Sequence, residues 1–554
     1  MSIVDLVIRK KVKNMANEED TFWADRMAEE IIKRTSYDYV AKIPKYSKFV
    51  VKTSASLSGV LHIGRLTDTV RSEAVYRALR DKGVKAEFIW VAEDMDPLRK
   101  VPEGIPKEYD KYIGMPVTDI PDIQGCHKTY ADHFTEDYFK VLSDFETEKM
   151  TRYSMRAEYK KGTFRPYIKK ILEHVDDIRG IVNKCKFDPE TKLSTDWIPW
   201  KPLCEKCGKL MTTKFLGMED GKVKYRCEDY QFEKFTAKGC GHVGLSDPMD
   251  GEGKLAWKSE WAMQWAYWNV VAEGAGKEYN LPNSAWFINA EICEKVFDFP
   301  APRPIFYEYI TTGGGGKMSA SLGNVIFPKD WLKVAEPEPL RYLFLKKIGK
   351  AREFKWTDVP RLMDDYDEAA MVYWGDKKLD NEKESIHLKR LFEMSQTSRP
   401  KHVRNISYGF AAMIAQITHD PKKIQEILER SHHLKDMTPE EVKAAMRRIE
   451  LSKNWVAKYA PPEHKFVVLK KMPDLIVNPT LKDLFDLIAN KIGMPGDALQ
   501  EFIYNTAKEK GIPLGAVFST AYRLFLGKET GPRLGPFLAS LDRDFVIKRL
   551  RMKG

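Results

Sequence analysis

A chain of 554 residues is too long for a single hydrophobic core, so we expect roughly two to four domains, and 43% hydrophobic residues are enough to fill them. No apolar run reaches the length of a bilayer span and no secretory apolar core is present near the start, which excludes a membrane-spanning protein and leads us to expect a soluble protein of the cytoplasm. Seven cysteines argue against a disulfide scaffold here, and a net charge of +11 is compatible with a polyanionic partner without proving one.

The first predicted region, residues 20–120, alternates helical and strand patterns, as an open parallel α/β sheet does. We expect strands at Lys48–Lys52 and Ala86–Val91, with a helix over Leu66–Lys82 between them. Asp94 and Asp96 follow the second strand directly and should point into or beside the ligand crevice, because ligands of such sheets bind beyond the carboxyl ends of the strands. The region is therefore predicted to form half of a ligand-binding α/β domain.

The loop between the first strand and the helix contains Gly59, His62 and Gly64. A helix N-terminus offers unpaired N–H groups and a positive dipole to an anion, and glycines let the backbone approach a ligand closely. The imidazole adds a donor for a phosphate. The loop predicts a nucleotide site, and the alternative is a structural junction with an incidental histidine.

The second region, residues 121–250, is rich in Cys, Gly, Pro and charged residues and is predicted to be an inserted module. Cys204 and Cys207 form a knuckle, and Cys227 and Cys240 supply two further thiols, as a closed structural zinc site requires. His242 is a rival fourth ligand, and four unrelated reduced thiols are the remaining alternative.

A second possible metal cluster lies at the start of this module. Asp122, Cys126, His127 and His133 offer one oxygen, one sulfur and two nitrogens, which are enough for tetrahedral zinc. Because neither cluster leaves an obvious open position for a substrate, both metals would brace the module instead of doing chemistry.

The third region, residues 251–328, returns to an aromatic-rich α/β pattern that begins near Trp257. It ends in Gly313–Gly316 and Lys317. Consecutive glycines suit a mobile loop that closes over phosphates, and a lysine there can neutralise phosphate charge. The alternative is a flexible linker with an incidental lysine.

Beyond Phe327 the pattern is almost entirely helical, with apolar residues at three-to-four spacing. A basic strip with interspersed aromatic residues could bind an RNA backbone and stack on bases, and the alternative is a solvated helix face with core aromatics. Its members are Arg447, Arg448, Lys453, Lys458, Lys465, Lys470 and Lys471, with Trp455 and Tyr459. The predicted helices are 340–345, 362–372, 386–394, 440–457, 481–492 and 499–509.

Two short segments carry a resemblance to a known family. His62-Ile-Gly-Arg65 and Lys317-Met-Ser-Ala-Ser321 resemble the HIGH and KMSKS motifs of class I aminoacyl-tRNA synthetases. The segments 92–102, 119–127 and 527–537 are similar to those of class I lysyl-tRNA synthetases. The resemblance extends from about Trp23 to the C-terminus.

The resemblance implies a Rossmann-like catalytic domain with an inserted zinc-binding module, then a stem-contact region at 329–380 and an all-α anticodon-binding domain at 381–554. It implies ATP-dependent attachment of lysine to tRNA(Lys) through lysyl-adenylate, with Mg accompanying ATP, two structural Zn, and a monomer.

The resemblance also implies which residues form the sites. The implied catalytic residues are His62, Gly64, Lys317 and Ser319. ATP would bind at Ser58, Gly59, His62, Gly64, Lys317 and Met318. Lysine would bind at Ser54, Ser56, Asp94, Trp257, Tyr307 and Glu308. The second zinc would take Asp122, Cys126, His127 and His133.

Some of these assignments have alternatives. Trp257 and Tyr307 could be core aromatics, and Asp94 and Glu308 could be partners in structural ion pairs. The chain also departs from the family: Arg65 stands for Asn, Tyr279 for His, and Ala320 for the second lysine of KMSKS. A paralogue with altered or weak aminoacylation is therefore the alternative function. A third possibility, a nucleotidyltransferase unrelated to tRNA, does not explain the long helical half.

Overall fold

The computed structural model describes residues 22–34, 37–40, 44–57, 59, 62–102, 104–186, 188–281, 283–312, 316–317, 325–431 and 437–553. The chain divides into two compact units, each described here by itself. Unit 1 runs to Pro328 and takes in Leu340–Phe354 and Asp380–Ser398, whereas unit 2 comprises Lys329–Pro339, Lys355–Leu379 and Arg399–Gly554. The domain boundaries expected from the sequence remain predictions.

Unit 1 is built around a five-stranded sheet in which every neighbouring pair is parallel. Its order is β12 (Arg303–Tyr307), β11 (Val270–Gly276), β1 (Phe49–Ala55), β2 (Ala86–Ala92) and β3 (Thr151–Ser154). The predicted first two strands are confirmed, and the first continues to Ala55. Both faces of such a sheet are covered, so its strands are rich in buried apolar residues such as Val50 and Val51.

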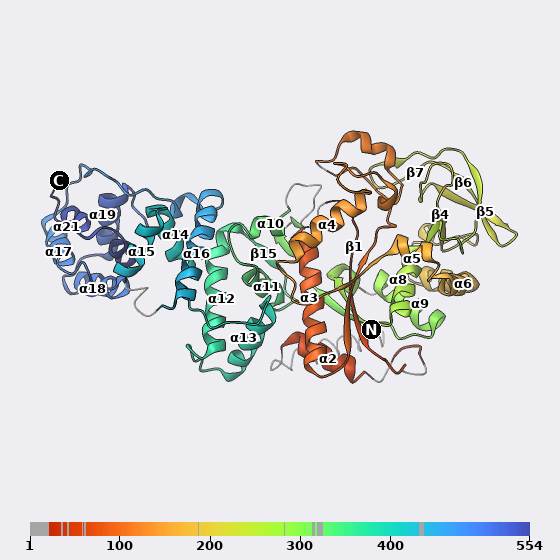
Figure 1. Cartoon of the computed structure of the whole chain (residues 1–554), viewed down its shortest axis with the longest axis horizontal. Helices are drawn as coiled ribbons and strands as arrows, with labels where there is room; N and C mark the ends of the chain where they lie inside the picture. The colour runs from red at the N-terminus through yellow and green to blue at the C-terminus, as the bar shows by residue number, and fades with distance from the viewer. Residues whose placement is uncertain are drawn as a thin grey trace. The chain divides into compact units, whose positions relative to one another are not determined.

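Helices cover the two faces of this sheet, and Figure 1 shows α3 (Ile63–Asp81) and α8 (Trp257–Trp268) on opposite sides of β1. Helix α3 contacts β1, β2 and β11, while α8 contacts β11 and α9 (Ala285–Phe297). Helix α2 (Trp23–Ile32) packs on α3. We call the two sides of the sheet the α3 face and the α8 face.

The strand order places a ligand crevice at the carboxyl end of β1. From β1 the chain moves outward through β2 and β3, and it returns on the other side of β1 through β11 and β12. The loops that follow β1 and β11 therefore leave the sheet toward opposite faces. Open parallel sheets bind their ligands at such a switch point.

The segment between β3 and β11 contains three helices, then small antiparallel sheets, and finally α8. The helices are α5 (Met155–Lys161), α6 (Arg165–Glu173) and α7 (Val175–Lys184), and α4 (Tyr130–Leu142) precedes β3. Strand β4 (Trp200–Pro202) pairs with β10 (Gly253–Leu255). Strands β5 (Thr213–Glu219), β6 (Lys222–Cys227) and β9 (Val243–Ser246) form a three-stranded sheet, and β7 (Tyr230–Gln231) pairs with β8 (Thr236–Ala237).

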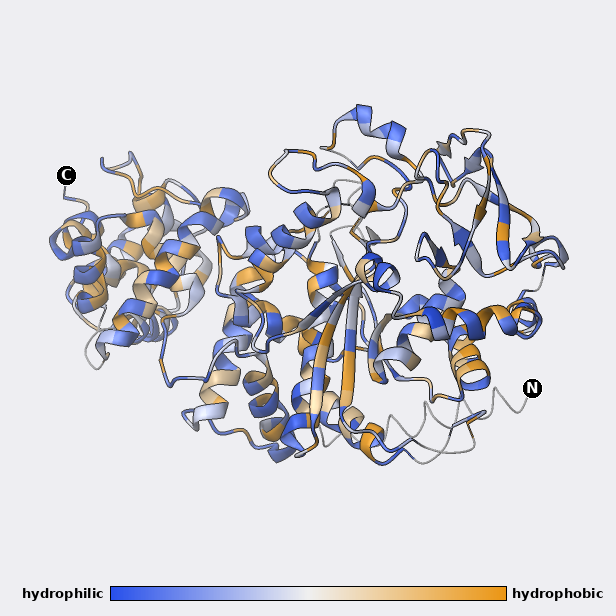
Figure 2. Cartoon of the chain, turned by 45° about the vertical axis from the view of Figure 1, so that its right-hand side comes forward, coloured by the Kyte–Doolittle hydropathy of each residue, from blue (hydrophilic) through white to orange (hydrophobic). Residues whose placement is uncertain are grey.

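Residues beyond Phe327 are mostly helical, as predicted, and Figure 2 shows these helices with alternating apolar and polar stripes. They are α10 (Pro328–Trp331), α11 (Pro337–Leu345), α12 (Val359–Trp374), α13 (Glu382–Ser395), α14 (Tyr408–Ile417), α15 (Pro421–Arg430), α16 (Pro439–Lys458), α17 (Pro479–Ala489), α18 (Gly496–Glu509), α19 (Leu514–Leu526), α20 (Leu534–Ser540) and α21 (Arg543–Leu550). Within unit 2, α14 to α21 enclose one apolar core that includes Ile414, Leu484 and Phe537. Every helix in the described residues is too short or too polar to span a bilayer.

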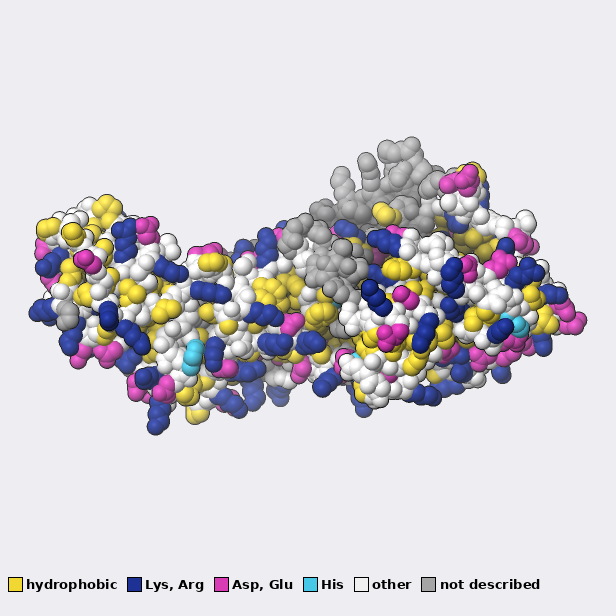
Figure 3. All heavy atoms as spheres, turned by 90° about the horizontal axis from the view of Figure 1, so that it is seen from above, with side chains coloured by type: hydrophobic (Ala, Val, Ile, Leu, Met, Phe, Trp, Pro, Cys, Tyr) yellow, Lys and Arg dark blue, Asp and Glu magenta, His cyan; other side chains and the backbone are white. Residues whose placement is uncertain are grey.

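Two members of the basic strip point into unit 2 instead of toward a partner. Arg448 is 3% exposed and pairs with Asp367 at 2.5 Å, and Trp455 is 1% exposed. Their assignment to an RNA-binding strip is therefore wrong, because helix α16 buries one stripe of its residues whatever their charge. Figure 3 shows Lys and Arg side chains spread over the visible face with Asp and Glu among them, so basic residues do not gather in one patch there.

Candidate active site

The loop after β1 supplies the N-terminus of α3. His62 is the N-cap, and its Nδ1 accepts a hydrogen bond from the Gly64 N–H at 3.1 Å. A Cβ on Gly64 would lie 2.7 Å from Cε1 of that imidazole, so a side chain there would displace the ring. Gly59 faces the Pro102 ring, and Arg65 is exposed on the first turn of the helix. Ser58 lies outside the described residues.

The segment around the second motif adjoins this loop. The Ile63 N–H donates to the carbonyl of Ile326 at 2.9 Å, which joins the start of α3 to the residues that follow the KMSKS-like sequence. Lys317 belongs to β14 (Gly316–Lys317), which pairs with β13 (Ile310–Thr312), and β15 (Arg352–Phe354) lies on the other side of β13. Gly313–Gly315, Met318, Ser319 and Ala320 lie outside the described residues. The residues that follow the second motif thus adjoin the first motif, and the roles of the motif residues remain predictions.

On the α3 face, a buried carboxylate lies at the carboxyl end of the sheet. Asp68 accepts hydrogen bonds from the Thr53 hydroxyl at 2.7 Å and from the Tyr307 hydroxyl at 2.8 Å. Burial, reinforced by the Asp68 charge, raises the pKa of Tyr307 well above its usual value. The Arg71 guanidinium lies 4.9 Å from the centre of the Tyr307 ring. A Cβ on Gly274 would lie 2.0 Å from Asp68 Oδ1, so only glycine leaves room for this carboxylate.

Trp257, Trp261 and Tyr279 pack together at the start of α8, and we call these three side chains the aromatic wall. Trp257 is 42% exposed and stacks on Trp261, with ring centres 5.3 Å apart and an interplanar angle of 17°. Tyr279 meets Trp257 at 5.9 Å and Trp261 at 5.4 Å. Burial raises the pKa of Tyr279, and the charge of Arg65 works against that rise. Tyr279 is therefore packed into this wall, near the charge of Arg65. Both positions were expected to depart from the family pattern.

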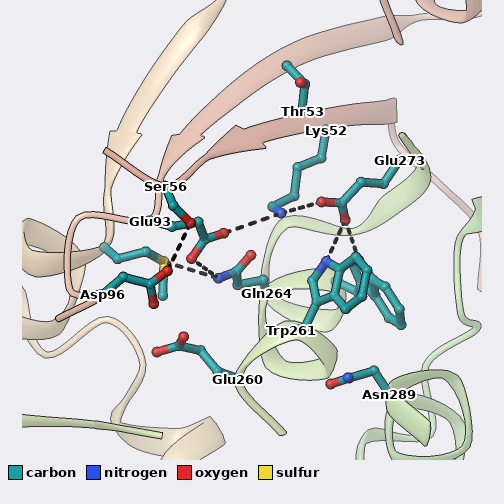
Figure 4. Close-up of polar contacts among 12 residues, drawn as sticks. Lys52, Thr53, Ser56, Glu93, Asp96, Glu260, Trp261, Gln264, Glu273 and Asn289 are labelled. Atoms are coloured by element: carbon teal, nitrogen blue, oxygen red, sulfur yellow. Dashed lines mark hydrogen bonds and ion pairs between the residues drawn. The ribbon is translucent and has the colours of Figure 1, made fainter. Parts of the chain in front are cut away.

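On the α8 face, a lysine and a glutamate form an ion pair inside the sheet (Figure 4). Lys52 and Glu273 are neighbours in the β1–β11 register, and the Lys52 Nζ lies 2.6 Å from Glu273 Oε1. The other oxygen, Oε2, accepts hydrogen bonds from the indoles of Trp261 at 3.0 Å and Trp265 at 2.5 Å. Lys52 has no exposed surface. The pair therefore fixes the inner end of the aromatic wall.

Glu93 extends this network from the end of β2. Its Oε1 lies 3.8 Å from Lys52 Nζ, and its Oε2 accepts a hydrogen bond from the Gln264 amide at 3.2 Å. Burial raises the pKa of Glu93 to about 8, against the lowering effect of Lys52. This carboxyl is therefore largely protonated at neutral pH.

A second branch connects the loop after β1 to β10. Ser56 donates to Asp96 Oδ2 at 2.9 Å, and Lys254 Nζ lies 2.9 Å from both Asp96 Oδ1 and Glu260 Oε2. The Tyr159 hydroxyl donates to Glu260 Oε1 at 2.5 Å. Figure 4 shows Ser56 beside Glu93 and Asp96, with Glu260 of α8 below them.

Both proposed counter-charges for lysine have partners within the protein. Asp94 accepts from the Ser154 hydroxyl at 2.5 Å and from the Arg156 N–H at 2.9 Å, and burial raises its pKa to about 6. Glu308 pairs with Lys277 at 3.0 Å. The structural alternative for these two residues thus has direct support. Ser54 lies within β1, opposite Val91 of β2.

Several residues of this edge were not predicted from the sequence. They are Lys52, Asp68, Arg71, Glu93, Asp96 as a partner of Ser56, Lys254, Glu260 and Glu273. A signal existed, because Lys52 and Glu273 interrupt apolar strand patterns and Asp68 and Arg71 interrupt the apolar helix pattern. A charge inside such a pattern indicates a buried partner, although the pattern does not say which one.

The four predicted cysteines come together in the inserted segment. All four sulfurs lie within 4.8 Å of one another, with Cys204 to Cys240 and Cys207 to Cys227 each at 3.6 Å. The Cys240 N–H donates to the Cys227 sulfur at 3.3 Å. The predicted rival, His242, pairs instead with Glu205 at 2.5 Å. The donor set fits a closed tetrahedral site for zinc.

The second predicted cluster also comes together. The ligand atoms of Asp122, Cys126, His127 and His133 lie within 4.8 Å of one another. The Cys126 sulfur lies 3.0 Å from Nδ1 of His127 and 3.4 Å from Nδ1 of His133. Asp122 Oδ1 is buried, accepts no hydrogen bond, and faces Nδ1 of His133 at 3.0 Å. That arrangement leaves an oxygen and two nitrogens directed at a common point, which fits a cation.

An outer carboxylate orients one of these imidazoles. Nε2 of His127 lies 2.8 Å from Glu136, which directs Nδ1 toward the cluster. Asp122 Oδ2 accepts hydrogen bonds from the backbone of Cys126 and His127, and these hold the pKa of Asp122 at about 2 despite its burial. The carboxylate is therefore ionised, as a metal ligand must be.

Comparison with known proteins yields consistent matches along the chain. The family model for tRNA synthetases class I (K) matches residues 21–398. A lysine–tRNA ligase of Methanosphaera stadtmanae is 32% identical over 553 residues, which cover 96% of this chain and 99% of that protein. A lysine–tRNA ligase of Methanocaldococcus jannaschii is 34% identical over 549 residues, 95% and 99% of the two chains. One of Pyrococcus horikoshii is 33% identical over 547 residues, 96% and 99% of the two chains.

Proposed function

Since this chain belongs to the family of tRNA synthetases class I (K), we propose that it is a lysine–tRNA ligase, which joins lysine to tRNA(Lys) in an ATP-dependent reaction. The observation that supports the proposal is the hydrogen bond between Ile63 and Ile326, which joins the first ATP motif to the residues that follow the second one, at the carboxyl edge of the sheet. Ligands of open parallel sheets bind at this edge.

The proposed reaction has two steps. The lysine carboxylate attacks the α-phosphorus of ATP, which forms lysyl-adenylate and releases pyrophosphate. A hydroxyl of the terminal ribose of tRNA then attacks the lysyl carbonyl and releases AMP. Neither step requires a protein nucleophile, so catalysis consists of positioning and electrostatic stabilisation. His62, the glycines and the α3 N-terminus would hold the phosphates from one side, and Lys317 and Ser319 from the other. Mg accompanying ATP would neutralise phosphate charge.

The amino acid would bind between the α3 N-terminus and the aromatic wall. Ser54, Ser56, Trp257 and Tyr307 are the proposed lining residues, and the rings suit the apolar stem of lysine. Asp94 and Glu308 already have partners in the protein. We therefore assign the buried acceptor for an ammonium group to Asp68, which accepts hydrogen bonds from two hydroxyls and also interacts with the charge of Arg71.

Each cysteine or histidine cluster is proposed to hold one structural zinc ion. The first would take Cys204, Cys207, Cys227 and Cys240, and the second would take Asp122, Cys126, His127 and His133. Both ions would cross-link loops of the inserted segment. Metal analysis of the purified protein should find two zinc ions per chain, and C227S should lose one of them while the other remains. A metal content unchanged by C227S would contradict the first assignment.

The helical region would bind the tRNA. We propose that residues 329–380 contact the stem and 381–554 contact the anticodon, with Arg447, Lys458, Lys470 and Lys471 exposed as expected of phosphate contacts. We also propose that the protein is a monomer and that it acts in the cytoplasm.

ATP–pyrophosphate exchange tests the activity directly. The full chain is assayed with each amino acid in turn, in the presence of tRNA. Lysine alone should support exchange, and K317A should abolish most of it. Absence of lysine-dependent exchange would refute the proposal, and exchange with a different amino acid would show that Tyr279 and Arg65 accompany a change of specificity.

A further inference from the structure

We propose that Lys254 is a positioning residue that acts through Asp96 on Ser56, so that Ser56 presents only acceptor lone pairs to the substrate and thereby selects an ammonium group. The inference rests on the proposed function, because it assigns a role in amino-acid selection at the same site. Lys254 lies on β10 of the inserted segment, and neither the motifs nor the residues expected to bind lysine include it.

The three residues form a linear chain of contacts. Lys254 Nζ lies 2.9 Å from Asp96 Oδ1, and Asp96 Oδ2 accepts the Ser56 hydroxyl at 2.9 Å. The two oxygens of one carboxylate thus connect the ammonium to the hydroxyl. The Lys254 side chain is 7% exposed, whereas Asp96 is 24% exposed. The chain therefore runs from the interior toward the loop after β1.

The proton positions in this chain are determined. A hydroxyl has one proton to donate and accepts with its lone pairs. Burial raises the pKa of Asp96, but the charge and hydrogen bond of Lys254 outweigh it and leave that pKa below its usual value. Asp96 is therefore ionised and cannot donate, so Ser56 must. With its proton directed at Asp96, Ser56 can only accept from a ligand, and amino-acid ammonium groups are donors.

Lys254 is itself held from a second side. Its Nζ lies 2.9 Å from Glu260 Oε2, and Glu260 Oε1 accepts the Tyr159 hydroxyl. The Tyr159 oxygen also accepts the N–H of Leu255, the residue after Lys254. The backbone and the ammonium of β10 are thus both fixed, which fixes the orientation of the Asp96 carboxylate.

This arrangement connects the inserted segment to the amino-acid pocket. Strand β10 pairs with β4, where Lys254 lies opposite Lys201, and the first ligand of the cysteine cluster, Cys204, follows β4 by two residues. A module that carries structural metal therefore reaches the substrate loop through one buried lysine.

A double-mutant cycle tests the proposal. S56A, K254M and K254M/S56A are compared with the wild type by the KM for lysine and for ATP in pyrophosphate exchange, and by the Kd for lysine from calorimetry. S56A should raise the lysine KM about tenfold and leave the ATP KM unchanged, because a hydrogen bond to a charged group is lost. K254M should do the same, and the double variant should be no worse than S56A alone.

Two further variants separate positioning from folding. K201M removes a lysine from the same two-stranded sheet, where burial alone lowers its pKa, and it should leave the lysine KM unchanged. D96N keeps the shape of the side chain but allows it to donate to Ser56, so it should raise the lysine KM severalfold even if K254M fails to fold. An unchanged lysine KM in D96N, or an independent multiplying effect of K254M on top of S56A, would overturn the proposal.

We call the contact chain of Lys254, Asp96 and Ser56 the relay. The test of the relay can be separated from the test of the proposed ligase activity. If the wild type activates another amino acid, the proposed function fails, and the same KM ratios are measured with that amino acid. The relay is upheld if the S56A and K254M effects remain non-additive, and it is overturned if they multiply.

Discussion

Asp68 and Glu273, two buried carboxylates on opposite faces of the parallel sheet, are stabilised differently. On the α3 face, Asp68 is held by two hydroxyls, those of Thr53 and Tyr307. On the α8 face, the carboxylate of Glu273 is held by an ammonium, that of Lys52, and by two indole N–H groups. Hydroxyl donors satisfy a carboxylate without cancelling its charge, whereas an ion pair cancels it. Asp68 is therefore better suited than Glu273 to bind a cationic ligand, even though the charge of Arg71 interacts with it, and the pair on the α8 face is suited to support the architecture.

This comparison predicts the largest loss of stability on the α8 face. K52M leaves the buried Glu273 carboxylate without its cation, and breaking a buried pair costs about 3–5 kcal/mol of the free energy of unfolding. Urea unfolding measures the difference. K48M is the matched control, because Lys48 is 43% exposed on the same chain segment and pairs with Glu87 near the surface, where such pairs contribute little. A loss below about 1 kcal/mol in K52M would refute a structural role for this face.

The α8 face should also make stability depend on pH. The pKa of Glu93 is about 8 in the folded protein against a usual value of 4.5. The unfolded chain therefore releases this proton at lower pH than the folded chain does. The folded chain binds more protons between these values, so the free energy of unfolding falls as pH rises through that window, by on the order of 4 kcal/mol between pH 5 and pH 8.5. Urea unfolding from pH 5 to pH 8.5 measures the slope. E93Q should flatten it, and an equal slope in E93Q would assign the dependence to other groups.

On the α3 face, the space beside Asp68 is the next most sensitive feature. G274A places a Cβ 2.0 Å from Asp68 Oδ1, and overpacking of this kind costs about 1–3 kcal/mol. Thermal unfolding and the lysine KM should both worsen. G180A is the control, because a Cβ at Gly180 in α7 meets no heavy atom within 4 Å, and replacing a helical glycine by alanine stabilises by up to about 1 kcal/mol. A neutral G274A would show that Asp68 moves freely.

The smallest effect on stability, with a larger effect on substrate binding, is expected from Y307F. Loss of one hydrogen bond costs about 1 kcal/mol in unfolding, and Asp68 loses a donor that fixes it toward the ligand. The lysine KM should rise several-fold while the ATP KM stays constant. Y309F serves as the control, because Tyr309 donates to Glu278 at the surface. If both variants behave alike, the α3 face has no special role in binding lysine.

The local elements were predictable from the sequence, and the long-range polar partners were not. The β1–α3 unit follows from an apolar run, a glycine-containing loop and a helical repeat, all within forty residues. The two ligand clusters follow from spacing, because turns bring such residues together. The Lys52–Glu273 pair joins positions 221 residues apart, so nothing near either residue identifies the other. Arg448 and Trp455 were placed wrongly because a helix pattern shows which residues share a stripe and not which stripe is buried.

The interleaved course of unit 1 has a consequence for its synthesis. Glu73 of α3 is 2% exposed, and its ion-pair partner is Arg341, 268 residues later. Asp25 pairs with Arg390, 365 residues further along the chain. At about 5–20 residues per second, a ribosome needs roughly 20–70 s to make the second of these intervals. Until Arg341 has been synthesised, Glu73 lacks the arginine with which it pairs in the folded chain. Unit 1 can therefore complete its folding only after its last helix, α13, has been synthesised.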